Sequence, residues 1–316
     1  MLENLIFSLN ATMPIFLMMV VGYTLKKIKV LDDNTTNVMN KLVFKLFLPA
    51  LLFMDLAEQD FIAMWDSTFV LFCTITTIVS IIICFFLSKL GNKDDRGEFI
   101  QASYRSAAAT LGIAFMTNIY DNVAMVALMI IGSVPIYNIV AVIVLSITSP
   151  DPSMHKDNKI LIKKTFVNII KNPIILGILV GLLWSLIDIP QPAIFAKSIT
   201  YLGNVASPLA LITLGASFEL KDLEEKIKPI IAININKLLL FCFLFLPLGI
   251  FMGFRDEKLV AALIMLGSAT TSSSFIMSKN MGHAGRISSC AVMTTTLFSS
   301  FTLTMWLFIL RSLGYI

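Results

Sequence analysis

The segment Pro14–Gly22, PIFLMMVVG, recurs later in the chain as Pro173–Gly181, PIILGILVG, with five of the nine residues identical. The offset between the two copies is 159 residues, and the same offset relates Pro49 to Pro208. Apolar composition alone produces some matching residues, but it does not align prolines and glycines at one common offset. The repeat therefore predicts two structurally equivalent halves.

The composition is typical of a membrane protein. Hydrophobic residues make up 57% of the 316 residues and charged residues 14%, and the mean hydropathy is +0.86. A helix needs about 20 apolar residues to cross roughly 30 Å of hydrocarbon, and stretches of that length recur here between short charged loops. A β-barrel would instead alternate polar and apolar residues. We predict an all-α polytopic protein whose solvent is the lipid bilayer.

Ten transmembrane helices are expected, five in each half. Residues 1–148 form the first five-helix repeat, 149–168 a cytoplasmic connecting loop and 169–316 the second repeat. Because five is an odd number, the second half enters the membrane in the opposite sense, which gives a 5+5 inverted repeat. The ten spans are predicted near residues 5–25, 36–55, 67–88, 99–118, 123–147, 169–187, 198–217, 229–253, 259–280 and 287–310.

The Lys and Arg residues indicate the orientation, because cytoplasmic loops carry the positive excess. Loops on one side hold nineteen of these residues, counting Lys237, and the opposite side holds four together with the acidic residues Asp55, Glu58, Asp60 and Asp66. Both termini are therefore expected outside the cytoplasmic membrane of the cell. The pI of about 8.8 then reflects loop topology, and no nucleic-acid partner is expected.

The chain shows no phosphate-binding loop, catalytic triad or zinc-ligand spacing, so neither an enzyme nor a cofactor nor a metal is expected. The four cysteines lie inside apolar stretches and are interpreted as small buried side chains. His155 and His283 fall in predicted cytoplasmic loops, where solvated side chains are expected.

Two polar stretches inside predicted spans are candidates for a binding site. Residues 103–112 in the fourth span contain Arg105, and residues 267–274 in the ninth are rich in Ser and Thr; the common offset pairs Gly112 with Thr271. Helices that break near the bilayer centre direct free N–H groups and helix N-termini toward an anion. The predicted substrate contacts are Arg105, Thr110, Gly112, Asn138, Thr270, Thr271, Ser272 and Ser273.

Each candidate also has a purely structural interpretation. Arg105 is either a fixed charge for a carboxylate or a side chain that snorkels to the nearby membrane surface. The Ser/Thr run also suits close helix packing, and Asn138 also suits a hydrogen bond between helices. No Asp or Glu falls clearly inside a span, which leaves the coupling ion open.

Several motifs, in their order and spacing, resemble the auxin efflux carrier family, whose bacterial members include malate permeases and related organic-anion carriers. The motifs are LFLPALLF at Leu46–Phe53, PIYN at Pro135–Asn138, KNPIILGILVG at Lys171–Gly181, SPLALITLGAS at Ser207–Ser217 and MTTTLFSSFTL at Met293–Leu303.

The resemblance implies a fold and a mechanism. Spans one, two, six and seven would form a scaffold and a homodimer surface, and spans three to five and eight to ten a transport unit. Spans four and nine would be broken and would cross at the site for a small organic anion, malate first. Transport would be driven by H⁺, by Na⁺ or by the membrane potential. The crossover prolines common in the family are absent here, so helix breaking would depend on Gly112 and the Ser/Thr run.

Two other functions fit a chain of this composition. A passive channel needs a continuous polar pore and no alternating states, and a sensor subunit binds a ligand without moving it. Cation exchange occurs in a distantly similar architecture, but it would require buried acidic residues that the sequence does not place in a span.

Overall fold

The computed structural model describes residues 2–57, 65–120, 124–150, 165–167, 169–187 and 191–316, and these residues form helices and connecting turns without a β-strand. The all-α prediction is confirmed for this part of the chain. Residues 151–164 of the predicted connecting loop, with His155, lie outside it, as do Glu58 and Asp60.

The first half contains nine helical segments among these residues: α1 (Leu2–Lys27), α2 (Asp33–Leu42), η1 (Val43–Phe47), α3 (Leu48–Ala57), α4 (Ser67–Ser88), η2 (Lys93–Asp95), α5 (Arg96–Tyr104), α6 (Ala108–Tyr120) and α7 (Ala124–Ile147). The segments of the second half are α9 (Pro173–Ile187), α10 (Ala193–Ala216), α11 (Leu220–Glu225), α12 (Ile227–Ile235), η4 (Asn236–Leu240), α13 (Phe241–Phe251), α14 (Asp256–Gly267), α15 (Ser272–Asn280) and α16 (Arg286–Ser312).

Long apolar helices identify a multi-pass membrane protein. Within the described residues, seven helices are long and apolar enough to cross a bilayer, and the bent pair Thr165–Lys171 and Pro173–Ile187 makes an eighth candidate. The seven are Asp33–Ala57, Ser67–Ser88, Met125–Ile147, Ala193–Ala216, Ile227–Phe251, Asp256–Asn280 and Arg286–Ser312. The total of ten spans stays a prediction.

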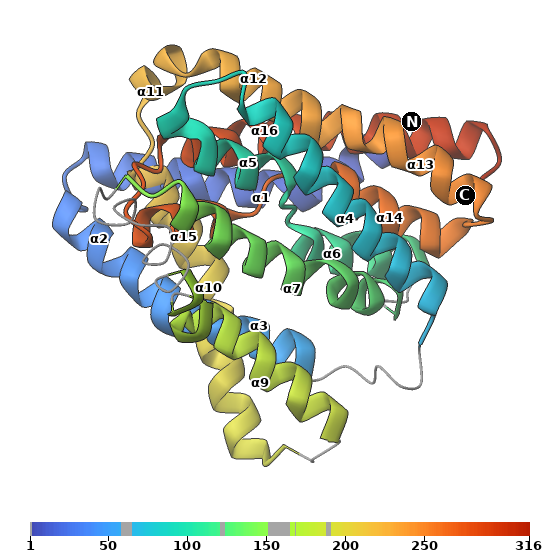
Figure 1. Cartoon of the computed structure of the whole chain (residues 1–316), viewed down its shortest axis with the longest axis horizontal. Coiled ribbons are helices and arrows are strands. Elements are labelled where there is room, and N and C mark those ends of the chain that lie inside the picture. The colour runs from blue at the N-terminus through green and yellow to red at the C-terminus, as the bar shows by residue number, and fades with distance from the viewer. Residues whose placement is uncertain (1, 58–64, 121–123, 151–164, 168, 188–190) are drawn as a thin grey trace.

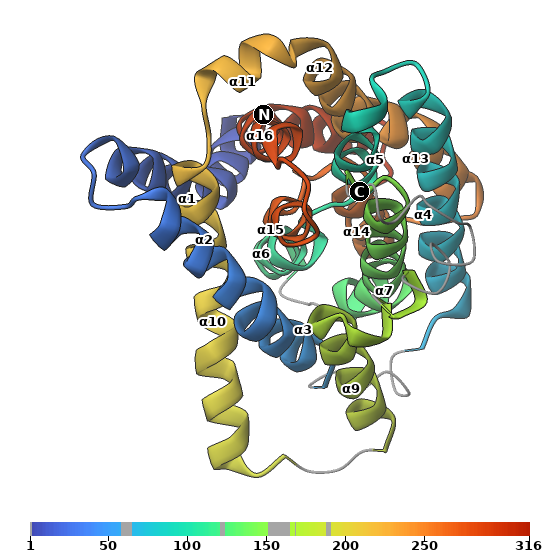
Figure 2. The ribbon, with the colours of Figure 1, turned by 60° about the vertical axis from the view of Figure 1, so that its left-hand side comes forward.

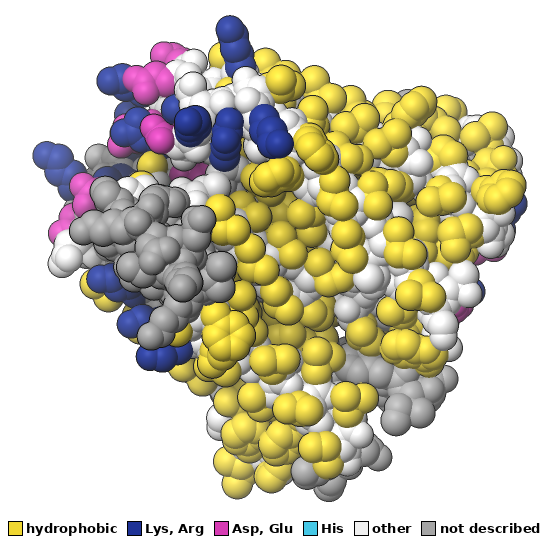
Figure 3. Space-filling view, viewed as in Figure 1, with side chains coloured by type: hydrophobic (Ala, Val, Ile, Leu, Met, Phe, Trp, Pro, Cys, Tyr) yellow, Lys and Arg dark blue, Asp and Glu magenta, His cyan; other side chains and the backbone are white. Residues whose placement is uncertain are grey.

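The two ends of the molecule differ in charge. Both termini lie at one end, and α2 and α11 lie at the other (Figure 1). Most of the Lys and Arg side chains on the face seen in Figure 3 gather at the end with α2 and α11, while hydrophobic side chains cover most of the remaining described surface. This is the charge separation that a protein spanning a bilayer presents.

Two pairs of helices, α1 with α10 and α9 with α3, are closely packed at a glycine. A Cβ atom at Gly22 of α1 would lie 2.1 Å from the carbonyl oxygen of Ile212 in α10, and a Cβ at Gly181 of α9 would lie 2.8 Å from that of Phe53 in α3. The sequence offset of 159 residues relates Gly22 to Gly181 and Phe53 to Ile212, so the two contacts involve corresponding residues. Glycine therefore sets the distance between these helices. Helix α3 also packs on α10, and Figure 2 shows α3, α9 and α10 extending to one side of α5, α14 and α15.

The structure corrects three assignments made from the sequence and adds a buried carboxylate, that of Glu98. Lys237, which the charge pattern predicts in a loop, lies in η4 inside the span Ile227–Phe251 and is buried. His283 is buried and its Nε2 lies 2.9 Å from the carbonyl oxygen of Leu145. Asp55 lies in α3 within the span Asp33–Ala57, and Glu98 is buried in α5. Carboxylates are therefore present in the helical bundle, with Glu98 buried and Asp55 partly buried.

Candidate functional site

Two helices are interrupted in the middle of the molecule, without a proline in either interruption. The chain leaves α5 after Tyr104 and enters α6 at Ala108, and it leaves α14 after Gly267 and enters α15 at Ser272. Arg105 is extended in the first break, with φ −76° and ψ 133°. The second break, SATT, contains three hydroxyl side chains, and that of Thr270 donates to a backbone carbonyl outside its own helix.

The two breaks satisfy each other's backbone. The N–H of Ala107 donates to the carbonyl of Ala269 at 2.8 Å. The Thr270 hydroxyl donates to the carbonyl of Ala102 at 2.7 Å, and the Thr270 N–H donates to Oγ1 of Thr295 at 3.0 Å. Because hydrocarbon offers no partner for a free backbone group, these bonds allow both helices to open inside a membrane.

The Arg105 side chain is 2% exposed and joins three helices. Its Nη2 donates to Oδ1 of Asn138 on α7 at 2.9 Å and to the hydroxyl of Ser273 on α15 at 2.8 Å. Its Nη1 donates to Oε1 of Gln101 at 3.3 Å and to Sδ of Met277 at 2.9 Å. All four acceptors are uncharged, and Nε has no hydrogen-bond partner among the described residues. The guanidinium therefore points into the bundle and does not snorkel.

A cavity of about 130 Å³ lies where the two breaks meet. The first residues of α6 and α15, Ala108 and Ser272, both line it, so two helix N-termini begin at its wall. Six of the eight predicted contact residues line this cavity: Arg105, Asn138, Thr270, Thr271, Ser272 and Ser273.

The other two predicted contacts are not among the lining residues. Gly112 lies in the second turn of α6, where a Cβ would lie 3.0 Å from Val126 Cγ1 and 3.2 Å from Met129 Cε on α7. It is a packing position, and its pairing with Thr271 is wrong, because Thr271 directly precedes α15. The side chain of Thr110 lies outside the described residues.

The family model described as "Membrane transport protein" matches residues 7–307. The chain belongs to this family. The resemblance to auxin efflux carriers is thereby confirmed at the level of the family.

Among the solved structures, a sodium proton antiporter has a fold similar to that of this membrane transport protein. The chain superimposes on the sodium proton antiporter MjNhaP1 from Methanocaldococcus jannaschii with a TM-score of 0.64, at 15% identity, over 96% of this chain and 97% of the other. At that identity the likeness concerns the fold. No curated protein matches the sequence.

Sequence reasoning missed part of the cavity of this membrane transport protein. Asp55 lines it, as do Leu48, Leu51 and Leu52 on the same helix. These residues follow the spacing i, i+3, i+4 and i+7 that marks one face of a helix. That spacing is the signal in the sequence for this face, and it is weak because Asp55 lies close to the end of its span.

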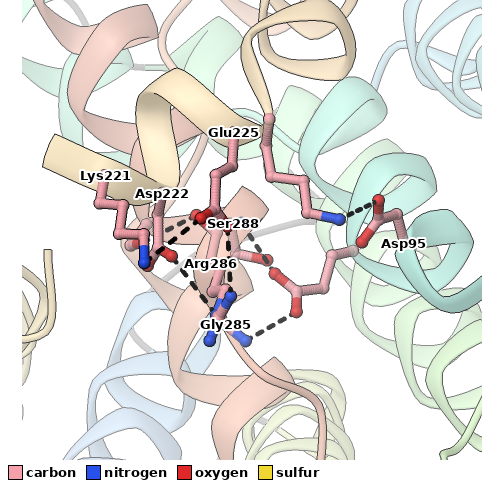
Figure 4. Close-up of polar contacts among 10 residues, drawn as sticks. Asp95, Lys221, Asp222, Glu225, Gly285, Arg286 and Ser288 are labelled. Atoms are coloured by element: carbon pink, nitrogen blue, oxygen red, sulfur yellow. Dashed lines mark hydrogen bonds and ion pairs between the residues drawn. The ribbon is translucent and has the colours of Figure 1, made fainter. Parts of the chain in front are cut away.

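The end of the molecule that contains α2 and α11 is called the lysine-rich end. A polar cluster at this end contacts the start of α16 (Figure 4). Arg286 forms ion pairs with Asp222 and Glu225 of α11 at 3.4 and 3.7 Å. Buried Glu98 accepts hydrogen bonds from the N–H groups of Gly285 at 2.6 Å and Ser288 at 2.9 Å. Burial raises the pKa of Asp222, an effect that Arg286 opposes. In this cluster the buried carboxylate of Glu98 stabilises a helix N-terminus.

Proposed function

We propose that this membrane transport protein is a secondary transporter that carries a small organic anion across the cell membrane by alternating access. One observation carries the proposal. The buried Arg105 guanidinium, whose four hydrogen-bond acceptors are uncharged, lines a cavity at which two helix N-termini begin.

Three positive groups at the cavity favour an anion, and the Asp55 carboxylate, which also lines the cavity, opposes them. A buried cation in a membrane costs several kcal/mol unless a partner compensates it. Each helix N-terminus adds the equivalent of about half a positive charge. A carboxylate between Arg105 and the first turns of α6 and α15 would be attracted by all three, and the unpaired Nε of Arg105 would supply a further donor.

The size of the cavity supports a small substrate. Its volume is about 130 Å³, and a cavity of about 150 Å³ accommodates benzene. Molecules with about six to nine non-hydrogen atoms are therefore the appropriate class, and malate is our first candidate. The hydroxyls of Thr271, Ser272 and Ser273 would hydrogen-bond to its oxygens.

The glycine contacts support a division into two moving parts. We propose that α1, α3, α9 and α10 form the scaffold and homodimer surface, and that α4–α7 and α12–α16 form the transport unit. The contacts of Gly22 and Gly181 at equivalent positions support an inverted repeat, and such a repeat allows inward- and outward-facing states of similar energy. The lysine-rich end would face the cytoplasm and both termini the outside.

Uptake into proteoliposomes tests this proposal. Purified protein is reconstituted, and uptake of labelled malate is measured with and without unlabelled malate inside. A carrier with two accessible faces gives saturable uptake that internal malate accelerates. Non-saturable flux without acceleration would favour a passive channel instead, and binding without flux would favour a sensor subunit. If malate is inert, the same assay is repeated with other small carboxylates.

A further inference from the structure

Lys237 is a buried cation that the proposed anion site does not use. It lies in the π-helical turn η4, in the middle of the span Ile227–Phe251, and is 1% exposed. Its ammonium donates to the carbonyl oxygens of Met265 at 3.1 Å and Leu266 at 2.9 Å. Both acceptors are backbone groups in the last turn of α14, immediately before the second break.

The break leaves these two carbonyls without helical partners. The N–H of Ser268 still donates to the carbonyl of Ile264 at 3.1 Å. The next helical donors would be the N–H groups of Ala269 and Thr270, but the chain is extended from Ser268 and the Thr270 N–H donates to Thr295. Lys237 therefore replaces the hydrogen bonds that α14 loses when it is interrupted.

Local packing brings the ammonium to this helix end. A Cβ atom at Gly267 would lie 2.5 Å from Sγ of Cys242, so the last turn of α14 lies directly against α13. Lys237 itself lies in the π-helical turn η4. A π-helical turn adds a residue to one turn of a helix, and such turns are frequent at functional sites.

The corresponding end of α5 is satisfied differently. There the carbonyl of Ala102 accepts from the neutral hydroxyl of Thr270, at 2.7 Å. The C-terminal end of α14 thus receives the side-chain nitrogen of a lysine, while the equivalent helix end in the other half receives a hydroxyl group. A cation at a helix C-terminus is favoured because the freed carbonyls carry partial negative charge.

We propose that Lys237 is a built-in cation, whose ammonium occupies the place that a coupling Na⁺ would take at the exposed carbonyls of an interrupted helix, so that the protein works without Na⁺. In carriers with broken helices, unwound carbonyls and helix C-terminal ends bind Na⁺. Here the same two carbonyls are already bound by a covalently attached charge. Only the uptake measurement below rests on the proposed transport function.

The stability of the purified full-length protein tests this role without any substrate. Thermal unfolding is measured in NaCl, KCl and N-methylglucamine chloride, and the native protein is expected to have the same Tm in all three. Lys237→Ala removes the ammonium and leaves space for a small cation. Methylammonium or Na⁺ is expected to raise the Tm of this variant saturably, by about 5 °C or more at a hundredfold excess over the Kd.

Two variants separate charge from packing. Lys237→Met fills the space without a charge, and its Tm is expected not to respond to methylammonium or Na⁺. Lys221→Ala removes a lysine that is 78% exposed in its side chain, and it is expected to behave like the native protein. A Lys237→Ala protein that folds but responds to neither cation overturns the proposal.

If no Lys237 variant folds, the Tm of the native protein in Na⁺ and in K⁺ still tests the proposal. A Tm that rises with Na⁺ but not with K⁺ overturns the proposal, and equal values support it. Uptake into proteoliposomes is expected to be equal in Na⁺ and K⁺ media. Absence of uptake for every anion would count against the transport function, and the Tm comparison would still test the role of Lys237.

Discussion

The backbone N–H of Ala107 donates to the carbonyl oxygen of Ala269 across 2.8 Å, so the two interrupted helices are joined main chain to main chain. Neither break contains a proline, and each depends on the other for hydrogen-bond partners. Hydrocarbon would leave an isolated break with unsatisfied polar groups, which cost several kcal/mol each. The two halves of the site therefore have to form together.

Removing one hydroxyl should test this mutual dependence. Thr270→Val keeps the shape of the side chain but leaves the carbonyl of Ala102 without its donor, and it should destabilise the protein by about 1–3 kcal/mol. Thr270→Ser, which retains the hydroxyl, should cost less. Thr302→Val on α16 removes an exposed hydroxyl and serves as control. Denaturant unfolding in detergent measures all three, and equal losses for Thr270→Val and Thr302→Val would contradict the argument.

Substrate binding should require both the charge of Arg105 and the planar hydrogen-bonding group of its guanidinium. Arg105→Ala removes the charge-assisted hydrogen bonds, and the apparent affinity for the transported anion should fall about 10- to 100-fold. Arg105→Lys keeps the charge but cannot reach Asn138 and Ser273 with one planar group, so it should recover only part of the affinity. Arg311→Ala, at the exposed end of α16, is the matched control in the uptake assay. Unchanged affinity in Arg105→Ala would exclude the proposed contact.

The glycine contacts predict two equivalent stability losses. Gly22→Ala and Gly181→Ala would place a Cβ atom 2.1 Å and 2.8 Å from a backbone carbonyl oxygen of a neighbouring helix, and each should destabilise the protein by about 1–3 kcal/mol. At Gly91 the nearest atom would be 3.8 Å away, so Gly91→Ala should have little effect. Thermal unfolding of the three variants checks this. If Gly22→Ala is as stable as Gly91→Ala, the helices do not approach as described.

The cluster in Figure 4 contains one strong and one weak contact to the start of α16. Glu98→Gln leaves one of two buried backbone N–H groups facing an amide donor, so a loss of about 1–3 kcal/mol is expected. Arg286→Ala breaks ion pairs of a half-exposed side chain, which should cost less than about 1 kcal/mol. Unfolding in denaturant should rank the two variants in this order, and the reverse order would refute the assignment.

Asp66 should make stability depend on acid pH. The hydrogen bond from Lys258 lowers the pKa of Asp66 below 3.8. A lowered pKa means that the ionised carboxylate stabilises the fold above pH 3.8, and that this contribution is lost as the pH falls through the lowered pKa. Asp66→Asn keeps a side chain able to accept from the Phe69 N–H but removes the charge. The Tm difference between native protein and variant, about 2–4 °C at most, should be constant from pH 5 to 7 and vanish in stronger acid. A difference that grows below pH 4 would contradict it.

Element positions followed closely from the sequence. The predicted span 67–88 coincides with α4, and 287–310 lies within α16. The four cysteines are free and buried, as expected. These properties depend on hydrophobicity and charge along a single segment, because the bilayer imposes the same requirement on every span.

The candidate site was predicted less completely. Arg105 and the hydroxyl residues were found because polar groups are conspicuous in apolar segments. The position of the first break was wrong: it falls at Arg105–Ala107, ahead of Gly112, because the partner that satisfies Ala107 is Ala269 in the other half.

Composition and pattern alone were therefore sufficient to predict a helical membrane protein with an internal repeat and polar residues in two of its spans. The burial of Lys237, the joining of the two breaks and the position of Asp55 at the cavity required the folded molecule. Each of these depends on a partner more than twenty residues away in the chain, and such a partner has no signature in the local sequence.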